Sequence, residues 1–351
     1  MKNFLQKYLP VTKMEEDARL GRKGFRIGIE ILIFLAVFYV SNMAQSIPLT
    51  IVTVISMFKS ESFMEMIEQA GSGSVDVTFD STSDLITEIM GGLMLPSLFF
   101  TAFTIVAVIV YCRYIEKRPI RSLGFRKGHI AAEYLVGIVI GAAIFSLAVG
   151  ICVLTGALDV TSASRGSLLL VPVFFVGFMI QGMSEELLCR GYLMLSISRR
   201  NSRVWAIFWS SLIFMALHVF NPGLTPLAFV NLFLFGVFAA VYFLKRGNIW
   251  GVGAIHSVWN FMQGNFYGIP VSGMGDLPSV FTSGGVDGRS AFWTGGAFGL
   301  EGGFAVTLVL LAATAVMLFL VPTKKSELAP VPEEVPSSEE NAEPAPETHL
   351  E

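Results

Sequence analysis

A small set of polar side chains that could activate water lies within long apolar stretches of the sequence. In chain order these residues are Glu185, Glu186, Arg190, His218, His256 and Asn260. A carboxylate and an imidazole that lie close together can hold a water molecule and remove its proton. Neighbouring N–H groups can stabilise the oxyanion that forms when this water attacks a carbonyl carbon. The residue types therefore point to hydrolysis at a carbonyl group.

Four of these residues form two pairs with the same spacing. Glu186 and Arg190 are four residues apart, and so are His256 and Asn260. Residues four apart lie on one face of a helix, so each pair forms a polar stripe on an otherwise apolar helix. We interpret Glu186 and Arg190 as a buried ion pair that supports helix packing, and His256 with Asn260 as donors to an oxyanion. Spacing alone does not choose between Glu185 and Glu186 as the base.

The composition excludes an ordinary water-soluble enzyme. Of the 351 residues, 53% are hydrophobic and 15% are charged, whereas soluble domains have about 25% charged residues. The apolar residues gather in blocks close to the ~20 residues that a helix needs to cross a bilayer. The blocks are 27–48, 89–111, 130–155, 167–197, 204–220, 226–244, 249–267 and 303–322. The predicted fold class is all-α, a polytopic integral membrane protein with about eight transmembrane helices.

The distribution of Lys and Arg predicts how these helices are oriented. Residues 1–26 carry seven Lys and Arg residues, and residues 113–127 carry six, but residues 59–88 carry one Lys and seven acidic residues. Cytoplasmic loops are enriched in Lys and Arg, so both termini are predicted to be cytoplasmic. We expect a transmembrane domain over 27–322 and a disordered, acidic, Pro-rich cytoplasmic tail over 323–351.

Helix geometry then compares how deeply the polar residues lie. At a rise of ~1.5 Å per residue, Glu185 and His218 each lie roughly 20 Å from the cytoplasmic end of their block. On the same basis, His256 and Asn260 lie roughly 10 to 18 Å from the cytoplasmic end of their block. We therefore expect these residues to converge on one layer inside the membrane. Ionisable groups at such depth are functional candidates because burying them is costly.

Three motifs resemble a known family. The stretches EELLCR (185–190), FMALH (214–218) and HSVWN (256–260), in this order on separate apolar blocks, closely resemble the motifs of the CAAX protease and bacteriocin-processing (CPBP, Abi) family. The resemblance covers roughly residues 120–267, and RSLGF (121–125) looks like the stretch that often precedes the family core. Each motif is weak alone, but the three together are specific.

The resemblance implies a type II CAAX prenyl endopeptidase-like glutamate intramembrane protease without a cofactor. It makes Glu185 the base, His218 its partner, His256 and Asn260 the oxyanion donors, Glu186 with Arg190 a scaffolding pair, and Phe214 a wall residue. One departure is Cys189, where relatives often carry an aromatic residue. We expect this change to alter packing and do not expect Cys189 to be a nucleophile.

The expected partners follow from this interpretation. The substrate would be a membrane-embedded or lipidated peptide or protein, and the lipid bilayer itself is a partner, but neither the oligomeric state nor the substrate can be read from the chain. The single-core architecture favours a bacterial plasma membrane. Two Glu and two His could coordinate zinc, but no HExxH motif is present, and we expect no metal. The basic connections indicate topology and anionic lipid, not nucleic acid.

Two other functions compete with proteolysis. A non-proteolytic membrane scaffold, or a bacteriocin-immunity or assembly factor, could use the same fold, although every motif position is intact. A proton-coupled transporter could use Glu and His as a relay, but the paired broken helices of an inverted repeat are absent from the sequence. Asn231, in the sixth block, is expected to form interhelical hydrogen bonds.

Overall fold

The computed structural model describes residues 7–72, 79–286 and 291–329, and these residues are mostly helical. The α-helices are α2 (Lys13–Arg19), α3 (Ile27–Lys59), α4 (Glu61–Gly71), α5 (Phe79–Phe100), α6 (Ala102–Val110), α7 (Ile130–Leu154), α8 (Val171–Glu186), α9 (Leu195–Ser198), α10 (Arg203–Ala216), α11 (Pro226–Arg246), α12 (Ile249–Phe261), α13 (Ala291–Thr294) and α14 (Phe304–Ala315). Short π-helices follow α6, α8, α12 and α14 directly: Tyr111–Ile115, Leu187–Met194, Met262–Phe266 and Val316–Leu320.

Five helical stretches are long and apolar enough to cross a membrane. They are Ile27–Lys59, Gly91–Ile115, Ile130–Leu154, Leu168–Ser198 and Pro226–Arg246. Arg203–Ala216 and Phe304–Leu320 are apolar but shorter. An integral membrane protein is thus supported by the structure, and the remaining three spans stay a prediction.

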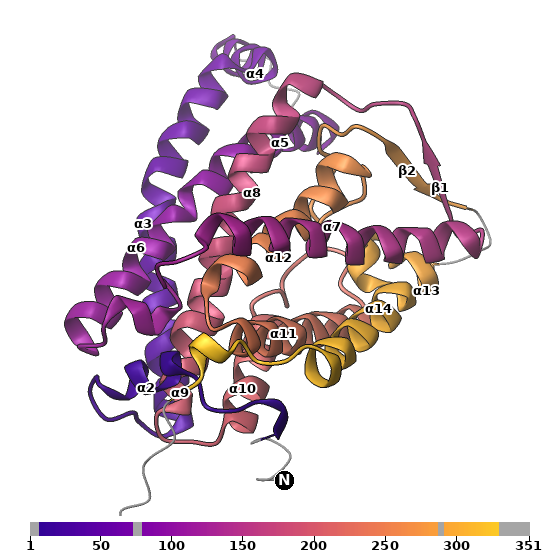
Figure 1. Cartoon of the computed structure of the whole chain (residues 1–351). Helices are drawn as coiled ribbons and strands as arrows, with labels where there is room; N and C mark the ends of the chain where they lie inside the picture. The colour runs from indigo at the N-terminus through magenta and orange to yellow at the C-terminus, as the bar shows by residue number, and fades with distance from the viewer. Residues whose placement is uncertain (1–6, 73–78, 287–290, 330–351) are drawn as a thin grey trace, which may run out of the picture.

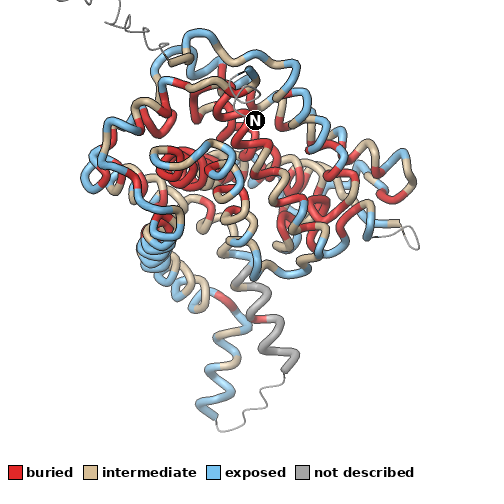
Figure 2. Tube along the Cα trace, turned by 90° about the horizontal axis from the view of Figure 1, so that it is seen from below, coloured by how far each residue is buried: buried red, intermediate tan, exposed pale blue. Residues whose placement is uncertain are grey.

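The outer surface has the character of a surface that faces lipid. Large apolar side chains on α3 point outward, including Leu32 and Ile47, which are 67% and 66% exposed. Figure 2 shows that buried residues concentrate in the centre of the molecule, whereas exposed ones lie on its periphery. Exposed apolar patches of this extent are rare on soluble monomers, but they match hydrocarbon, where backbone groups are satisfied within the helices.

Helix α12 is the central element of the core. It packs between α7 and α8, and α11 also contacts it. In Figure 1, α3 and α6 lie on the left with α8 beside them, α7 crosses the middle of the view to the right, and α11 and α14 lie below α7. Small residues permit the close approach: a Cβ added at Gly182 of α8 would lie 2.6 Å from the Ser257 backbone nitrogen, and one at Gly253 would lie 2.5 Å from the Met183 methyl carbon. Such small-residue contacts are typical of helix pairs in membranes.

The α7–α12 contact can be tested by adding a single methyl group. A Cβ at Gly137 of α7 would overlap the Gly251 carbonyl oxygen and lie 2.7 Å from the Ala254 Cβ, whereas a Cβ at Gly150 on the same helix meets nothing within 4 Å. We expect Gly137→Ala to lower the melting temperature of the purified protein and Gly150→Ala to leave it unchanged or raised, because Ala favours helix over Gly. Equal melting temperatures would contradict this account of the interface.

Two local features differ from the sequence prediction. The apolar block 204–220 predicts one helix, but α10 ends at Ala216 and His218 lies in the turn that follows. After Ala216 the backbone forms tighter turn hydrogen bonds, from His218 N–H to the Met215 carbonyl and from Val219 N–H to the Ala216 carbonyl. Pro222 then disfavours helix at Asn221. The structure also contains a two-stranded antiparallel ribbon, β1 (Leu158–Thr161) with β2 (Thr282–Gly285), that the sequence did not predict.

The two ends of the described chain lie together. Thr12 pairs with Leu328 in a β-bridge, and Ala329 N–H donates to the Val11 carbonyl at 3.0 Å. The start of the predicted tail, residues 323–329, is therefore packed against the rest of the protein, and Lys324 forms an ion pair with Glu133 at 3.1 Å. Residues 330–351 lie outside the described part, so the disorder expected there is untested.

Candidate active site

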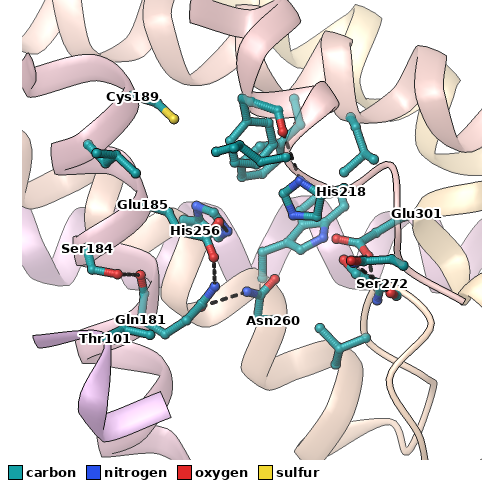
Figure 3. Close-up of a pocket in the computed structure, with 18 of the residues that line it drawn as sticks. Thr101, Gln181, Ser184, Glu185, Cys189, His218, His256, Asn260, Ser272 and Glu301 are labelled. Carbon is teal, nitrogen blue, oxygen red and sulfur yellow. Dashed lines mark hydrogen bonds and ion pairs between the residues drawn. The ribbon is translucent and has the colours of Figure 1, made fainter. Parts of the chain in front are cut away.

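Polar residues from all three motifs line one cavity. It has a volume of about 290 Å³, and Glu185, His218, His256 and Asn260 all line it. Glu185 comes from α8, His218 from the turn after α10, and both His256 and Asn260 from α12. Figure 3 shows these side chains around a common space. Residues remote in sequence thus meet, as the depth comparison predicted.

Glu185 is positioned by a hydrogen-bonded chain that runs through Gln181. The Gln181 Nε2 group donates to Glu185 Oε1, and Asn260 Nδ2 donates to Gln181 Oε1 at 3.0 Å. Residues 181 and 185 are one helical turn apart, which makes the first contact local. The side chain of Glu185 is 28% exposed, and its Oε2 lies 3.7 Å from His256 Nε2. Glu185 therefore keeps access to the cavity while its orientation is set.

Glu186, although adjacent to Glu185, has a different environment. Its side chain is fully buried, as is that of Arg190, and Arg190 donates to Glu186 Oε1 at 2.9 Å. The same oxygen lies 2.8 Å from His256 Nδ1. The chain changes from α-helix to π-helix between Glu186 and Leu187, and such π segments occur frequently at functional sites. Glu186 thus has no part in lining the cavity, but it orients a residue that does.

The hydrogen bond to Glu186 determines which ring nitrogen of His256 carries the proton. The ionised carboxylate can only accept, so the proton lies on Nδ1. Nε2 is then the atom left for the cavity, where Glu185 Oε2 is 3.7 Å away. A second partner that sets the ring orientation of a functional histidine in this way is common in active sites. The ring is also packed edge-on against Phe235, with centroids 5.0 Å apart.

His218 is held in the same way, with its Nδ1 bound and its Nε2 left for the cavity. Its Nδ1 lies 2.9 Å from the carbonyl oxygen of Phe214, one turn earlier. A carbonyl only accepts, so Nδ1 carries the proton and, in the neutral ring, Nε2 is an acceptor. This bond also satisfies one of the free carbonyls at the end of α10. His218 therefore presents an acceptor, not a donor, to the cavity that it lines.

Phe214 forms a wall of the cavity, in agreement with its predicted position. The Arg190 guanidinium lies over its ring at 4.6 Å from the centroid, a cation–π geometry. The rings of His218 and Phe235 pack against it with centroid distances of 4.9 and 5.8 Å. Phe214 thereby connects the buried ion pair to His218.

Asn231 forms the interhelical hydrogen bonds expected of it. Asn231 of α11 donates to the carbonyl oxygens of Glu301 and Gly303 at 2.7 and 2.8 Å and accepts from Thr307 at 2.6 Å. Its hydrogen bonds thus join α11 to the segment before α14. Cys189 lines the cavity but is fully buried and in the reduced form.

Sequence reasoning assigned no role to Gln181 or Phe235, although both contact the site. Gln181 could have been found, because it stands one turn before Glu185 in an otherwise apolar block and continues the same polar stripe. Phe235 could not, because a phenylalanine in an apolar helix carries no signal that distinguishes it from other core residues. A third residue, Glu301, lines the cavity from a glycine-rich segment with no helical pattern.

The arrangement combines two acceptors with donors. Glu185 and His218 face the cavity as acceptors, and Asn260 keeps a second amide N–H beyond the one it gives to Gln181. Such a set can hold a water molecule by its hydrogens and receive an oxyanion on the other side. Among the described residues there is no group of three or more His, Cys, Asp or Glu side chains placed to hold a metal ion.

Comparison with known proteins supports the family resemblance. The family model described as type II CAAX prenyl endopeptidase Rce1-like matches residues 167–262. This range contains all three motifs and lies within the 120–267 segment that carried the resemblance, so the family prediction is confirmed. No curated protein and no solved structure matches the chain.

Proposed function

Because residues 167–262 belong to the type II CAAX prenyl endopeptidase Rce1-like family, we propose that this membrane protein is a glutamate-dependent intramembrane endopeptidase. It hydrolyses a peptide bond of a membrane-associated or lipidated substrate with a water molecule held by Glu185 and His218. The observation that carries this proposal is the pair of acceptors in one cavity: the Glu185 carboxylate and the Nε2 of His218, whose Nδ1 is committed to the Phe214 carbonyl.

Water activation follows from these two acceptors. A water molecule that donates one hydrogen to Glu185 and the other to His218 has its lone pair directed away from both. When the oxygen attacks the scissile carbonyl carbon, Glu185 takes the proton as general base. The Gln181 amide, which donates to the other oxygen of Glu185, prevents the carboxylate from turning away.

The negative charge that develops on the carbonyl oxygen must be stabilised by hydrogen-bond donors. Asn260 offers its second N–H, and His256 offers Nε2–H when the ring is an imidazolium paired with Glu186. Collapse of the tetrahedral species breaks the C–N bond, and the proton held by Glu185 passes to the leaving amine. The products are a carboxylic acid terminus and a free amine, and no cofactor takes part.

A comparison of protein termini tests the proposal. Native membranes are incubated with purified wild-type protein or with Glu185→Ala, and new N- and C-termini are identified by mass spectrometry. We expect termini that appear only with the wild type and that share a sequence around the cut. Thermal melting establishes that both proteins are folded. Identical sets of termini from two folded proteins would contradict proteolysis and favour a scaffold.

The oxyanion site makes a separate prediction. Asn260→Ala should lower kcat by about 10²–10³-fold, the usual effect of removing one oxyanion donor, with a smaller change in KM. Asn265→Ala serves as the control for removing a buried amide. Asn265 Nδ2 donates to the Pro278 carbonyl at 2.7 Å and does not line the cavity, so this variant should lower the melting temperature without a comparable loss of kcat in the folded fraction. Steady-state kinetics on a peptide identified above measure both variants. An unchanged kcat for Asn260→Ala would contradict its assignment.

A further inference from the structure

The segment between α12 and α14 forms one wall of the cavity. Val271, Ser272 and Met274 line the cavity from this segment. It is held in place at several points: Asn221 Nδ2 donates to the Ser272 carbonyl at 3.0 Å, and Gly273 N–H donates to the Phe298 carbonyl at 2.9 Å. The wall is therefore a built part of the site. It lies outside residues 167–262, which carry the family match.

Glu301 lies in this wall, and its two carboxylate oxygens differ in their hydrogen bonds. Oε2 accepts from the Ser272 backbone N–H at 2.9 Å and from the Ser272 hydroxyl at 2.6 Å, and Gln263 Nε2 is 3.4 Å away. No donor among the described residues hydrogen-bonds Oε1. Because every contact holds the same oxygen, the other one is free for the cavity, and Figure 3 shows Glu301 on the His218 side, across from Glu185.

Glu301 also lacks a cationic partner, unlike the other buried acids. Six glutamates in the described chain are buried. Five of them form ion pairs with Arg: Glu15, Glu30, Glu116, Glu133 and Glu186. The sixth, Glu301, is 8% exposed and forms no ion pair with any described residue. A buried carboxylate without a compensating charge is costly, and an ionisable group of this kind in a membrane protein indicates a functional site.

The other charged groups that line the cavity do not offset the negative charge of Glu301. Its described lining includes two carboxylates, Glu185 and Glu301, and two histidines, but no Lys or Arg. Arg190 lies behind Phe214 and is fully buried, so it does not reach the cavity. A site lined by carboxylates attracts a cationic group and repels an anionic one.

We propose that Glu301 is a substrate-binding residue whose free oxygen pairs with a Lys or Arg side chain of the peptide, close to the scissile bond. This inference rests on the proposed endopeptidase function and names its substrate class: membrane-associated peptides with a basic residue near the cut. A cavity of about 290 Å³ accommodates only a short stretch of chain around the reacting carbonyl. The basic residue therefore lies within roughly three residues of the cut, at ~3.3 Å of reach per extended residue.

The test uses an N-palmitoylated apolar peptide in which one position is Lys, norleucine or Glu and the rest of the sequence is constant. This variable position is moved over three residues on each side of the peptide centre. Norleucine matches the Lys stem without its charge. Binding is measured by fluorescence anisotropy to Glu185→Gln protein in nanodiscs, where no cleavage occurs. At one position we expect Lys to bind about 10-fold or more tightly than norleucine, the scale of a charge-assisted hydrogen bond, and Glu to bind most weakly.

Variants assign this preference to Glu301. In the Glu185→Gln background, Glu301→Gln should bring the Lys and norleucine affinities close together. Asp276→Asn should leave the preference intact, because Asp276 lies in the same wall segment but pairs with Arg165 and does not line the cavity. Equal binding of Lys and norleucine peptides at every position would overturn the proposal, and this comparison needs no variant at position 301 to fold.

The two proposals fail in different ways. Cleavage of these peptides by the wild type, without any preference for Lys in kcat/KM or in binding, would overturn the role of Glu301 and leave the endopeptidase intact. A Lys preference that depends on Glu301, without cleavage by wild-type protein, would support the binding site and contradict hydrolysis.

Discussion

Replacing Glu185 by Gln is expected to lower kcat/KM by about 10³-fold, the scale of a lost general base, and to leave the melting temperature nearly unchanged. Gln retains the size of the side chain and can still accept from Gln181 through its amide oxygen, but it cannot take a proton from water. The side chain is partly exposed to the cavity, so the surrounding packing does not depend on its charge. Peptide hydrolysis and thermal melting on the same preparation measure both effects.

The neighbouring residue is the matched control. Glu186→Gln should lower the melting temperature, because Glu186 is fully buried and is the partner of both Arg190 and His256. Its effect on kcat/KM should be smaller than that of Glu185→Gln, because it acts through the orientation of His256. The reverse order of kinetic effects would make Glu186 the base. This comparison answers the question that the spacing of two adjacent carboxylates left open.

Breaking the buried ion pair should have the largest effect on stability. Arg190→Met leaves the Glu186 carboxylate buried without its guanidinium, and removing one partner of a buried pair costs about 3–5 kcal/mol. The substitution also removes the cation that lies over the Phe214 ring. We expect a large fall in the free energy of unfolding, measured by denaturation in mixed micelles.

The double variant separates charge from packing. Glu186→Gln with Arg190→Met removes both charges, so it should recover a substantial part of the stability that Arg190→Met loses. A double variant as unstable as the sum of the two single variants would mean that the pair contributes through packing and not through charge compensation.

The motif residues could be found from the sequence because two physical constraints are local. Hydrocarbon tolerates few ionisable groups, so Glu185, His218 and His256 stand out in apolar blocks. Helical spacing then puts Glu186 with Arg190 on one face, and the structure contains that ion pair at 2.9 Å. The family match rests on the same stretches.

The end of α10 shows where periodicity was insufficient. An apolar pattern continues through His218, and it predicted that the helix continues as well. The helix ends earlier, and the turn directs Nδ1 of His218 to the Phe214 carbonyl. That bond determines which nitrogen faces the cavity, and with it whether His218 accepts or donates.

The sequence by itself determined that the chain is helical and lies in a membrane, which residues could activate water, and which family its three motifs resemble. Each of these follows from composition, from spacing along one helix, or from short motifs. The tertiary structure decided that His256 is bound to Glu186, that Gln181 joins Asn260 to Glu185, and that Glu301 lines the cavity without an ion pair to any described residue. These contacts join residues of different helices, or of a helix and an irregular segment. They form only because small residues let α7, α8 and α12 approach closely. No periodicity along a single helix specifies that distance.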